Sequence, residues 1–119
     1  MYRSNSVNAM DLGPDERYKF FVSYVKKEQL LWGLYNSGWA EATDESETKG
    51  LIVFPEKDTA EAYAKSDFDG YTPKEIKLSS FLERWVDKLM GQSYNIAVFP
   101  TPIDAPKFVD PYSIRDDLN

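Results

Sequence analysis

Hydrophobic residues recur at helical spacing in three parts of the chain. From Pro14 to about Lys27, apolar side chains follow one another at intervals of three and four residues, which predicts the first helix. Proline followed by two acids suits a helix start, because proline loses no hydrogen bond there and acids face the positive end of the dipole. Residues 56–66 and 80–90 show the same periodicity and predict two further helices.

Alternating or unbroken apolar runs predict the strands. Residues 30–35 alternate, Asn36-Ser37-Gly38 is a turn signal, and residues 39–43 are expected to return as the second strand of a hairpin. Residues 51–54 form an unbroken apolar run, which is typical of a strand buried on both faces. The remaining predictions are strands at 75–78 and 94–99, a brief pairing at 108–109, and a short last helix from Asp110-Pro111.

This order of elements predicts an α+β fold in a single domain of residues 1–119. A small mixed β-sheet of five or six strands, with an N-terminal hairpin, is expected to be packed by three main helices and a short C-terminal helix. The length suits one domain, and 42% of the residues are hydrophobic, which is enough for a core. We expect the folded part of this domain to span about residues 14–118. Residues 1–10 are expected to be a loose leader, because helix signals begin only after Met10.

The chain contains neither histidine nor cysteine, which excludes several kinds of site. Disulfides, thiolate zinc sites, His-ligated metals and His-assisted triads all need one of these residues. The six glycines are dispersed and match no phosphate-binding loop. We therefore expect no cofactor and no catalytic residue, although a mechanism that uses Asp, Glu, Lys or Tyr stays open.

The sequence carries no sign of a membrane segment or an export signal. No apolar run approaches the roughly 20 residues that cross a bilayer. The first eleven residues lack the apolar stretch of a signal peptide. Together with the missing cysteines, this predicts a cytoplasmic protein without a membrane partner.

The formal net charge is −6, and the basic residues are scattered, with no more than two together at Lys26-Lys27. A surface that binds nucleic acid needs clustered lysine and arginine, so we expect no nucleic-acid partner. The simplest role of the acidity is solubility. A basic protein partner would also suit the charge, because complementary fields speed association. The oligomeric state stays open.

A series of short motifs runs in a fixed order from about residue 14 to residue 118. They are Glu16-Arg17-Tyr18 with Phe21, Trp32-Gly33-Leu34-Tyr35, Gly38-Trp39-Ala40, Phe54-Pro55-Glu56, Tyr63-Ala64, Tyr71-Thr72-Pro73-Lys74, Ile76 with Leu78, Phe81-Leu82-Glu83 with Trp85, and Val98-Phe99-Pro100-Thr101-Pro102. In this order and spacing, the chain resembles a family of small bacterial proteins of unknown function, DUF2750. The resemblance implies a compact α/β-type domain and supplies no activity and no catalytic residues.

Aromatic residues are frequent around the expected hairpin. In a strand, Trp32 and Tyr35 point to opposite faces, because their separation is odd. If the hairpin covers the domain on one side, one of the two faces solvent. We expect Trp32 and Trp85 to pack in the core. Tyr35 and Trp39 are candidates for a protein-binding patch, since Trp and Tyr dominate interface hot spots, and ordinary packing is the alternative.

Three acidic residues, Asp44, Glu45 and Glu47, form a cluster in the polar connection between two predicted strands. Like charges in a row usually mark a solvated loop. A docking site for a basic partner is the functional alternative, and we carry all three residues as candidates for an interaction surface.

Thr101 lies between two prolines at the end of a predicted strand. Prolines stiffen the backbone, and loops at strand ends are common binding sites in α/β folds. Thr101 is therefore a candidate binding residue. The structural alternative is a rigid strand exit that positions the last helix.

The loop Asp67-Phe68-Asp69-Gly70 places two carboxylates two residues apart. Hard cations such as Ca²⁺ and Mg²⁺ bind oxygen ligands at this kind of spacing, but a complete calcium-loop pattern is absent. The structural alternative, a polar turn at Asp69-Gly70, fits better. We therefore assign no metal site.

The leading hypothesis for function is a non-catalytic protein-interaction or regulatory domain that acts through exposed aromatic and acidic residues. The alternative is a domain that binds a small molecule or a divalent metal, or an enzyme that uses carboxylates. That alternative needs a pocket near Pro100-Thr101-Pro102 or near Asp67–Gly70, containing a carboxylate of raised pKa. A structural homo-oligomer is a third hypothesis.

Overall fold

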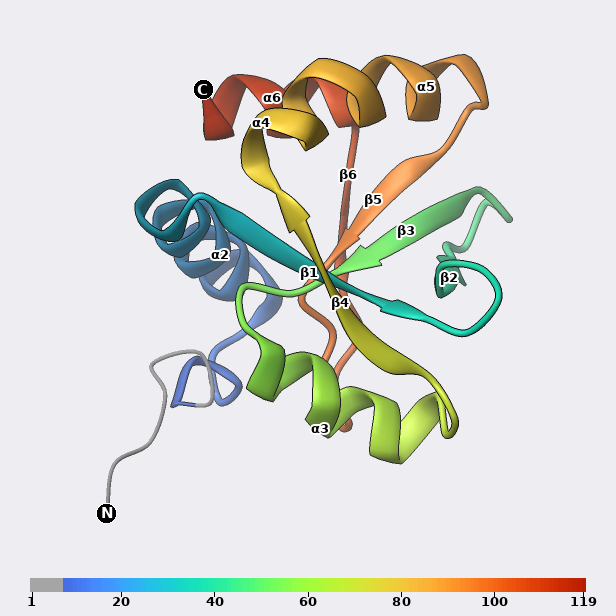
Figure 1. Ribbon diagram of the computed structural model, residues 1–119. Helices are drawn as coiled ribbons and strands as arrows, with labels where there is room; N and C mark the ends of the chain where they lie inside the picture. The colour runs from blue at the N-terminus through green and yellow to red at the C-terminus, as the bar shows by residue number, and fades with distance from the viewer. Residues whose placement is uncertain (1–7) are drawn as a thin grey trace.

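The computed structural model describes residues 8–119, and in this part of the chain six strands form two small sheets (Figure 1). One sheet is an antiparallel pair of β1 (Leu30–Tyr35) and β4 (Thr72–Lys77). The other has the order β2-β3-β5-β6, formed by β2 (Glu41–Thr43), β3 (Lys49–Val53), β5 (Asn95–Val98) and β6 (Lys107–Val109). Its central strands β3 and β5 run parallel, whereas both outer pairs are antiparallel.

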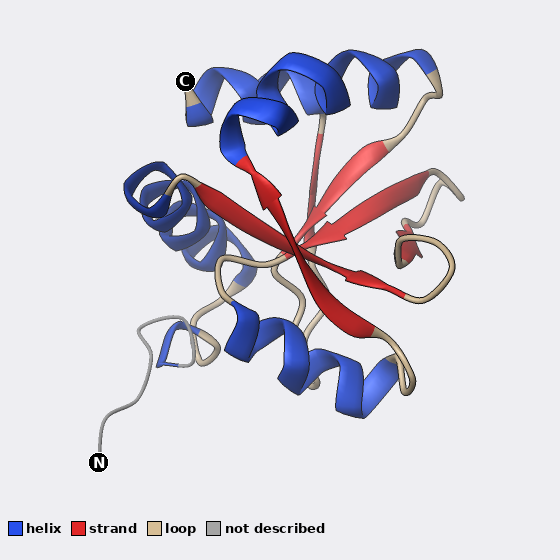
Figure 2. Cartoon of the chain, viewed as in Figure 1, coloured by secondary structure: helices blue, strands red, loops and turns tan. Residues whose placement is uncertain are grey.

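The helices lie around these sheets (Figure 2). They are α2 (Pro14–Glu28), α3 (Lys57–Asp67), α6 (Pro111–Leu118) and a continuous helical segment made of α4 (Leu78–Ser80), η1 (Phe81–Trp85) and α5 (Val86–Gly91). Helix α6 packs against α5 and α2, whereas α3 packs against β4 and β1 at the opposite end of the view. The predicted α+β class is confirmed, whereas the five or six strands expected in one mixed sheet are six strands divided between two sheets.

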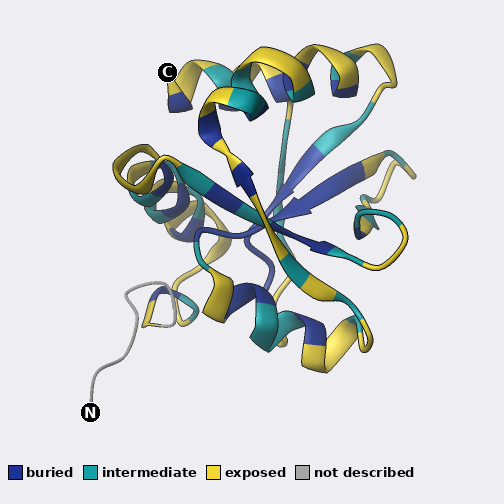
Figure 3. Cartoon of the chain, in the orientation of Figure 1, coloured by how far each residue is buried: buried dark blue, intermediate teal, exposed yellow. Residues whose placement is uncertain are grey.

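The core lies between the four-stranded sheet and the helices, where β3 and β5 are the most deeply buried strands (Figure 3). Residues 51–54 are all buried, as predicted for an unbroken apolar run. Burying a strand on both faces removes nearly all its side-chain surface from water, which is the main stabilising contribution to folding.

Helix α2 follows the sequence pattern closely. Pro14 is its first residue, two acids occupy the first turn, and Phe21 and Val25 face the core. The helix ends at Glu28, one residue beyond the expected end, because Gln29 adopts a left-handed conformation that stops it. The pattern missed one member of the buried face: Arg17, four residues before Phe21, is fully buried.

The N-terminal hairpin pairs differently from our expectation. The turn at Asn36-Ser37-Gly38 is present, and a single bridge joins Tyr35 to Trp39. Beyond it, β1 pairs along all six residues with β4, and β2 pairs with β3. A partner strand that is distant in sequence thus pairs with β1 along its whole length, which outweighs the pairing suggested by the local turn.

The helical segment 78–91 also begins earlier than expected. Leu78 is buried, and its N–H donates to the carbonyl of Gln29, so the helix follows β4 without a loop. No side chain caps this start of the helix. Within it, η1 is a π-helical turn, in which Val86 N–H donates to the Phe81 carbonyl. Such widened turns are rare and often occur at functional sites.

The expected loose leader falls mostly outside the described residues, which exclude residues 1–7. Of its last residues, Ala9 is 4% exposed and belongs to the core cluster.

Candidate functional site

A groove of about 340 Å³ lies between β2 and the η1–α5 part of the helical segment. Leu51 and Leu89 provide its apolar lining, and Trp39 and Trp85 provide its aromatic walls. We call this site the tryptophan groove. Its volume is at the small end of protein pockets that hold ligands.

The two indole rings meet edge to face, with centroids 5.1 Å apart at an interplanar angle of 78°. Tyr35 packs on the other side of Trp39 in the same manner, at 5.2 Å and 75°. This edge-to-face arrangement is the favoured geometry for aromatic pairs. Lys74 of β4 extends this row, with its ammonium 4.3 Å from the centre of the Tyr35 ring. The structure thus brings together the predicted candidates Tyr35 and Trp39 and adds Trp85.

Gly33 of β1 makes room for the Trp39 ring. A Cβ atom placed on Gly33 would lie 2.8 Å from two ring carbons of Trp39, closer than such atoms approach in proteins. Gly33 and Tyr35 therefore share the face of β1 that contacts Trp39. Trp32 points to the opposite face, as the odd spacing predicted, and packs on the core beside Leu30 and Pro55.

Two cations stand on the helical wall of the groove. Arg84 and Lys88 both line it and are exposed, and neither forms an ion pair within residues 8–119. They are four residues apart, so they lie on the same side of the helix, where like charges repel. The neighbouring acid Asp87 is directed instead to Arg115 of α6, at 3.2 Å.

One hydrogen bond crosses the opposite, strand-side wall. The hydroxyl of Tyr94 donates to Oε2 of Glu41 in β2, at 2.7 Å. This bond to the carboxylate raises the pKa of Tyr94, because the phenol stays protonated to make it. Glu41 and Tyr94 are both side chains that sequence reasoning did not select.

The predicted acidic cluster forms the turn of the β2–β3 hairpin, and its three members have different roles. Oδ1 of Asp44 accepts hydrogen bonds from the backbone N–H groups of Ser46 and Thr48, at 2.8 and 2.9 Å. Asp44 therefore stabilises the turn. Glu45 and Glu47 are exposed and remain candidates for contact with a partner.

The last candidate, Thr101, lies in the connection between β5 and β6. Only 3% of Thr101 is exposed, and its hydroxyl oxygen accepts a hydrogen bond from Ile103 N–H at 3.4 Å. At the tip of the same loop, Ile103 is 90% exposed. The structure therefore places Thr101 inside a rigid strand exit and away from the tryptophan groove.

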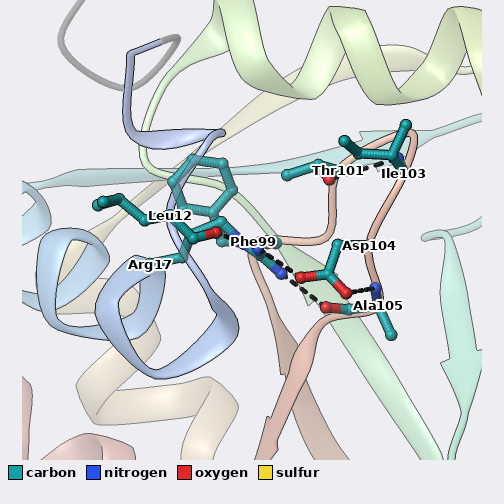
Figure 4. Close-up of polar contacts among 7 residues, drawn as sticks. All are labelled: Leu12, Arg17, Phe99, Thr101, Ile103, Asp104 and Ala105. Carbon is teal, nitrogen blue, oxygen red and sulfur yellow. Dashed lines mark hydrogen bonds and ion pairs between the residues drawn. The ribbon is translucent and has the colours of Figure 1, made fainter.

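Arg17 binds this connection through its guanidinium (Figure 4). Its guanidinium donates to the carbonyls of Phe99, Leu12 and Ala105 at 2.9, 2.6 and 2.7 Å, and it pairs with Asp104 Oδ2 at 2.9 Å. We call these five residues the Arg17 cluster. Phe99 has a positive φ of 54°, a conformation that costs a bulky residue about 1–3 kcal/mol and persists only when its surroundings impose it.

The pair with Arg17 lowers the pKa of Asp104, because the nearby guanidinium favours the charged carboxylate. Asp15 behaves similarly: its hydrogen bond with Lys107, at 2.8 Å, lowers the pKa of that carboxyl group. Neither shift is the upward one that the acid–base alternative required.

A wider hollow of about 850 Å³ lies along the exposed side of α2. Its polar groups largely pair with one another, as in the Asp15–Lys107 ion pair and the 2.5 Å hydrogen bond from Tyr18 to Asp117. Burial and this bond raise the pKa of Tyr18. Most of the charged groups of this hollow are therefore already engaged within the fold.

The Asp67–Gly70 segment ends α3 and turns into β4. Gly70 has a φ of 91°, which confirms the turn at this position. Within the described residues, no group of three potential metal ligands lies together. The segment borders a small hollow of about 150 Å³ beside Asp69 and Tyr71.

None of the helices between residues 8 and 119 has the length and apolar character needed to cross a membrane.

Comparison with known families gives one result. The model of a family described as "Protein of unknown function (DUF2750)" matches residues 18–118. The chain belongs to the DUF2750 family. The resemblance seen in the ordered motifs is thereby confirmed, and the family description assigns no activity to its members. No curated protein and no solved structure matches the chain.

The groove of this DUF2750 member combines predicted and unpredicted residues. Trp85 was expected in the core, as part of the apolar stripe of its helix, and it does pack against the core while exposing an edge to the groove. The sequence did contain a signal for the helical wall. Arg84 and Lys88, four residues apart beside that stripe, form a like-charged pair that stability alone does not favour.

Proposed function

We propose that this chain is a non-catalytic protein-binding domain that holds an apolar segment of its partner in the tryptophan groove. The observation that carries this proposal is the edge-to-face pair of Trp39 and Trp85, which forms the walls of a concave site. Tryptophan is among the residues most enriched at binding hot spots, and a rigid aromatic pocket loses little conformational entropy when a partner binds.

The composition of the groove suits a protein segment better than a reacting substrate. The carboxylate of Glu41 is engaged by Tyr94, and the Arg84 and Lys88 cations stand at the exposed rim. An apolar centre surrounded by charged and polar groups is the usual anatomy of a protein-binding patch.

The partner is expected to carry basic residues near the segment that it inserts. The chain has a net charge of −6, and Glu45 and Glu47 are exposed at the hairpin turn. Glu41 and the start of that turn are three residues apart, which is about 10 Å along an extended strand. A basic partner would be attracted at long range by the net charge and held locally by the turn.

Affinity capture tests this proposal when it is done with matched variants. The tagged protein, Trp85→Ala, and the control Tyr112→Ala are each incubated with lysate of the organism that encodes the chain. Tyr112 is an exposed aromatic residue of α6 that contacts Arg115 outside the groove. Circular dichroism first establishes that all three proteins fold.

We expect one protein to be recovered in equal amounts by the wild type and Tyr112→Ala, to be lost with Trp85→Ala, and to be released at high salt. If folded Trp85→Ala captures the same proteins as the wild type, the groove is not the binding site and the proposal is wrong. If capture is empty and a metabolite raises the melting temperature of the wild type alone, the groove binds a small molecule instead.

A further inference from the structure

The charge on the helical wall of the tryptophan groove is opposite in sign to that of the whole protein. Arg84 and Lys88 line the groove together, whereas Glu41 is the single acid among its lining residues. The net charge of the chain is −6, so this local excess of positive charge is not a consequence of composition. It selects for an anionic group at short range.

Neither of these cations is neutralised by an acidic side chain in the described part of the chain. Within residues 8–119 neither has an acidic partner at ion-pair distance, and their spacing of four residues makes them repel each other. By contrast, Arg115 on the adjacent helix is paired with Asp87. Two cations without an acidic partner that both line a groove provide a site for an anionic group of a ligand.

The local backbone supports this reading. Arg84 and Trp85 are the last two residues of the π-helical turn η1. The π-turn shifts the register of the side chains that follow it relative to a regular helix, and such turns are frequently retained at functional sites. Both Arg84 and Trp85 line the groove.

The groove therefore presents an apolar, aromatic surface next to two cations. Acidic residues lie further along the β2–β3 hairpin, whose strand β2 borders the groove. A peptide chain that ends in an apolar residue has the complementary arrangement. Its last side chain is apolar, its terminal carboxylate is anionic, and residues upstream can be basic. An arginine can bind a carboxylate through two parallel hydrogen bonds, which makes it well suited to this group.

Resting on the function proposed above, we propose that the tryptophan groove recognises the free C-terminus of its partner. The side chain of the last residue packs against the joined faces of Trp39 and Trp85, and Arg84 and Lys88 bind the terminal carboxylate. Basic residues upstream lie toward Glu45 and Glu47. The volume of about 340 Å³ suits one or two residues and is too small for a longer chain to bury itself completely.

The probe is a pool of hexapeptides of random sequence with free C-termini, passed over the immobilised full chain. The sequence that binds best is then synthesised twice, once with a C-terminal carboxylate and once with an amide. Binding of both peptides is followed by tryptophan fluorescence, because two of the three tryptophans of the chain line the groove. The acid is expected to bind at least about tenfold more tightly than the amide, the usual cost of removing one member of a close charge pair.

Arg84→Gln links that difference to the groove. Arg84 is exposed, so the variant is expected to fold, and its melting temperature checks this. Arg84→Gln should weaken binding of the acid by about tenfold and leave binding of the amide unchanged. Lys27→Gln, which removes an exposed positive charge at the end of α2, is the matched control and should behave as the wild type.

Three results would overturn the inference. The first is equal affinity for acid and amide, and the second is an equal effect of Arg84→Gln on both. The third is the absence of any binder in the pool. If these occur while Trp85→Ala still loses the captured partner, the protein-binding function stands and only the recognition of a C-terminus is wrong. An N-acetylated amino acid that binds as tightly as the hexapeptide would overturn both proposals in favour of a small-molecule site.

Discussion

The Arg17 cluster and the tryptophan groove use the same kind of side chain for opposite purposes. Arg17 is fully buried, and the chain itself provides acceptors for its guanidinium: three backbone carbonyls and the carboxylate of Asp104. Arg84 is exposed beside a groove and has no acidic partner within residues 8–119. The hydrogen bonds of Arg17 stabilise the fold, whereas the guanidinium of Arg84 is available to a binding partner.

This difference teaches how to separate structural from functional charge in a small domain. A buried charge must be satisfied internally, because an unpaired one is very costly, so its presence reports on folding. An exposed charge that repels its neighbour contributes little or nothing to stability, so its place beside an aromatic slot needs another explanation. The comparison predicts that substitutions in the two regions have different effects, and each experiment below tests part of it.

The largest effect is expected from Arg17→Met. The variant leaves three carbonyls without their donor and removes the guanidinium that holds the strained Phe99 in place. We expect the free energy of unfolding to fall by about 3 kcal/mol, measured by urea denaturation. Arg84→Met is the matched control and should change it by less than about 0.5 kcal/mol. Equal effects of the two substitutions would contradict the comparison.

The next largest effect is expected from Gly33→Ala. The added methyl group would meet the Trp39 ring at 2.8 Å, so the indole has to move and the wall of the groove moves with it. We expect a loss of about 1–3 kcal/mol in the free energy of unfolding, together with a changed tryptophan emission spectrum. Gly38→Ala provides the control, since nothing lies within 4 Å of its added atom. An unchanged spectrum in Gly33→Ala would show that Trp39 is not held by this contact.

The Asp104–Arg17 pair gives stability a dependence on pH. The folded pKa of Asp104 is lowered from 3.8, so the unfolded state takes up its proton first as pH falls. The pair's contribution to the free energy of unfolding is therefore present in full above pH 3.8. It is lost as pH drops through the lower pKa that Asp104 has in the folded state. Asp104→Asn should therefore be less stable than the wild type at pH 7, and the gap should narrow as pH falls below 3.8. A gap that stays constant in urea denaturations from pH 7 to pH 2 would exclude this pair as its source.

The smallest effect is expected from Arg84→Gln in the absence of a partner. Removing one of two repelling charges should raise the free energy of unfolding by about 0.2–0.5 kcal/mol at low salt. The gain should vanish at 1 M salt, where charges more than about 3 Å apart are screened. A loss of stability would show that Arg84 has a stabilising partner within the fold, and the contrast with Arg17 would fail.

The sequence predicted those parts of the fold that depend on local pattern. Helix α2 and the buried run at 51–54 follow directly from the periodicity of their apolar residues. The partner of β1 could not be predicted in this way, because β4 is distant in sequence and mostly exposed, with only Ile76 buried among its six residues. Strand pairing depends on long-range contacts that no local window contains.

The candidate site was predicted in the same partial way. Tyr35 and Trp39 were selected because aromatics near a turn can be exposed, and they do pack together, with Trp39 lining the groove and Tyr35 behind it. The wall opposite them comes from a helix more than 40 residues later, so its contribution becomes visible only in the folded chain. Thr101 was selected for its prolines, yet the turn that they rigidify buries it.

The central claim, that the tryptophan groove is where a partner binds, has a direct test in the indole N–H signals of the NMR spectrum. The chain has three tryptophans, and two of them, Trp39 and Trp85, line the groove while Trp32 lies elsewhere. When the captured partner is titrated into the labelled protein, the signals of Trp39 and Trp85 should shift and that of Trp32 should stay in place. A shift of Trp32 alone, or no shift of Trp39 and Trp85 at saturation, would contradict the account.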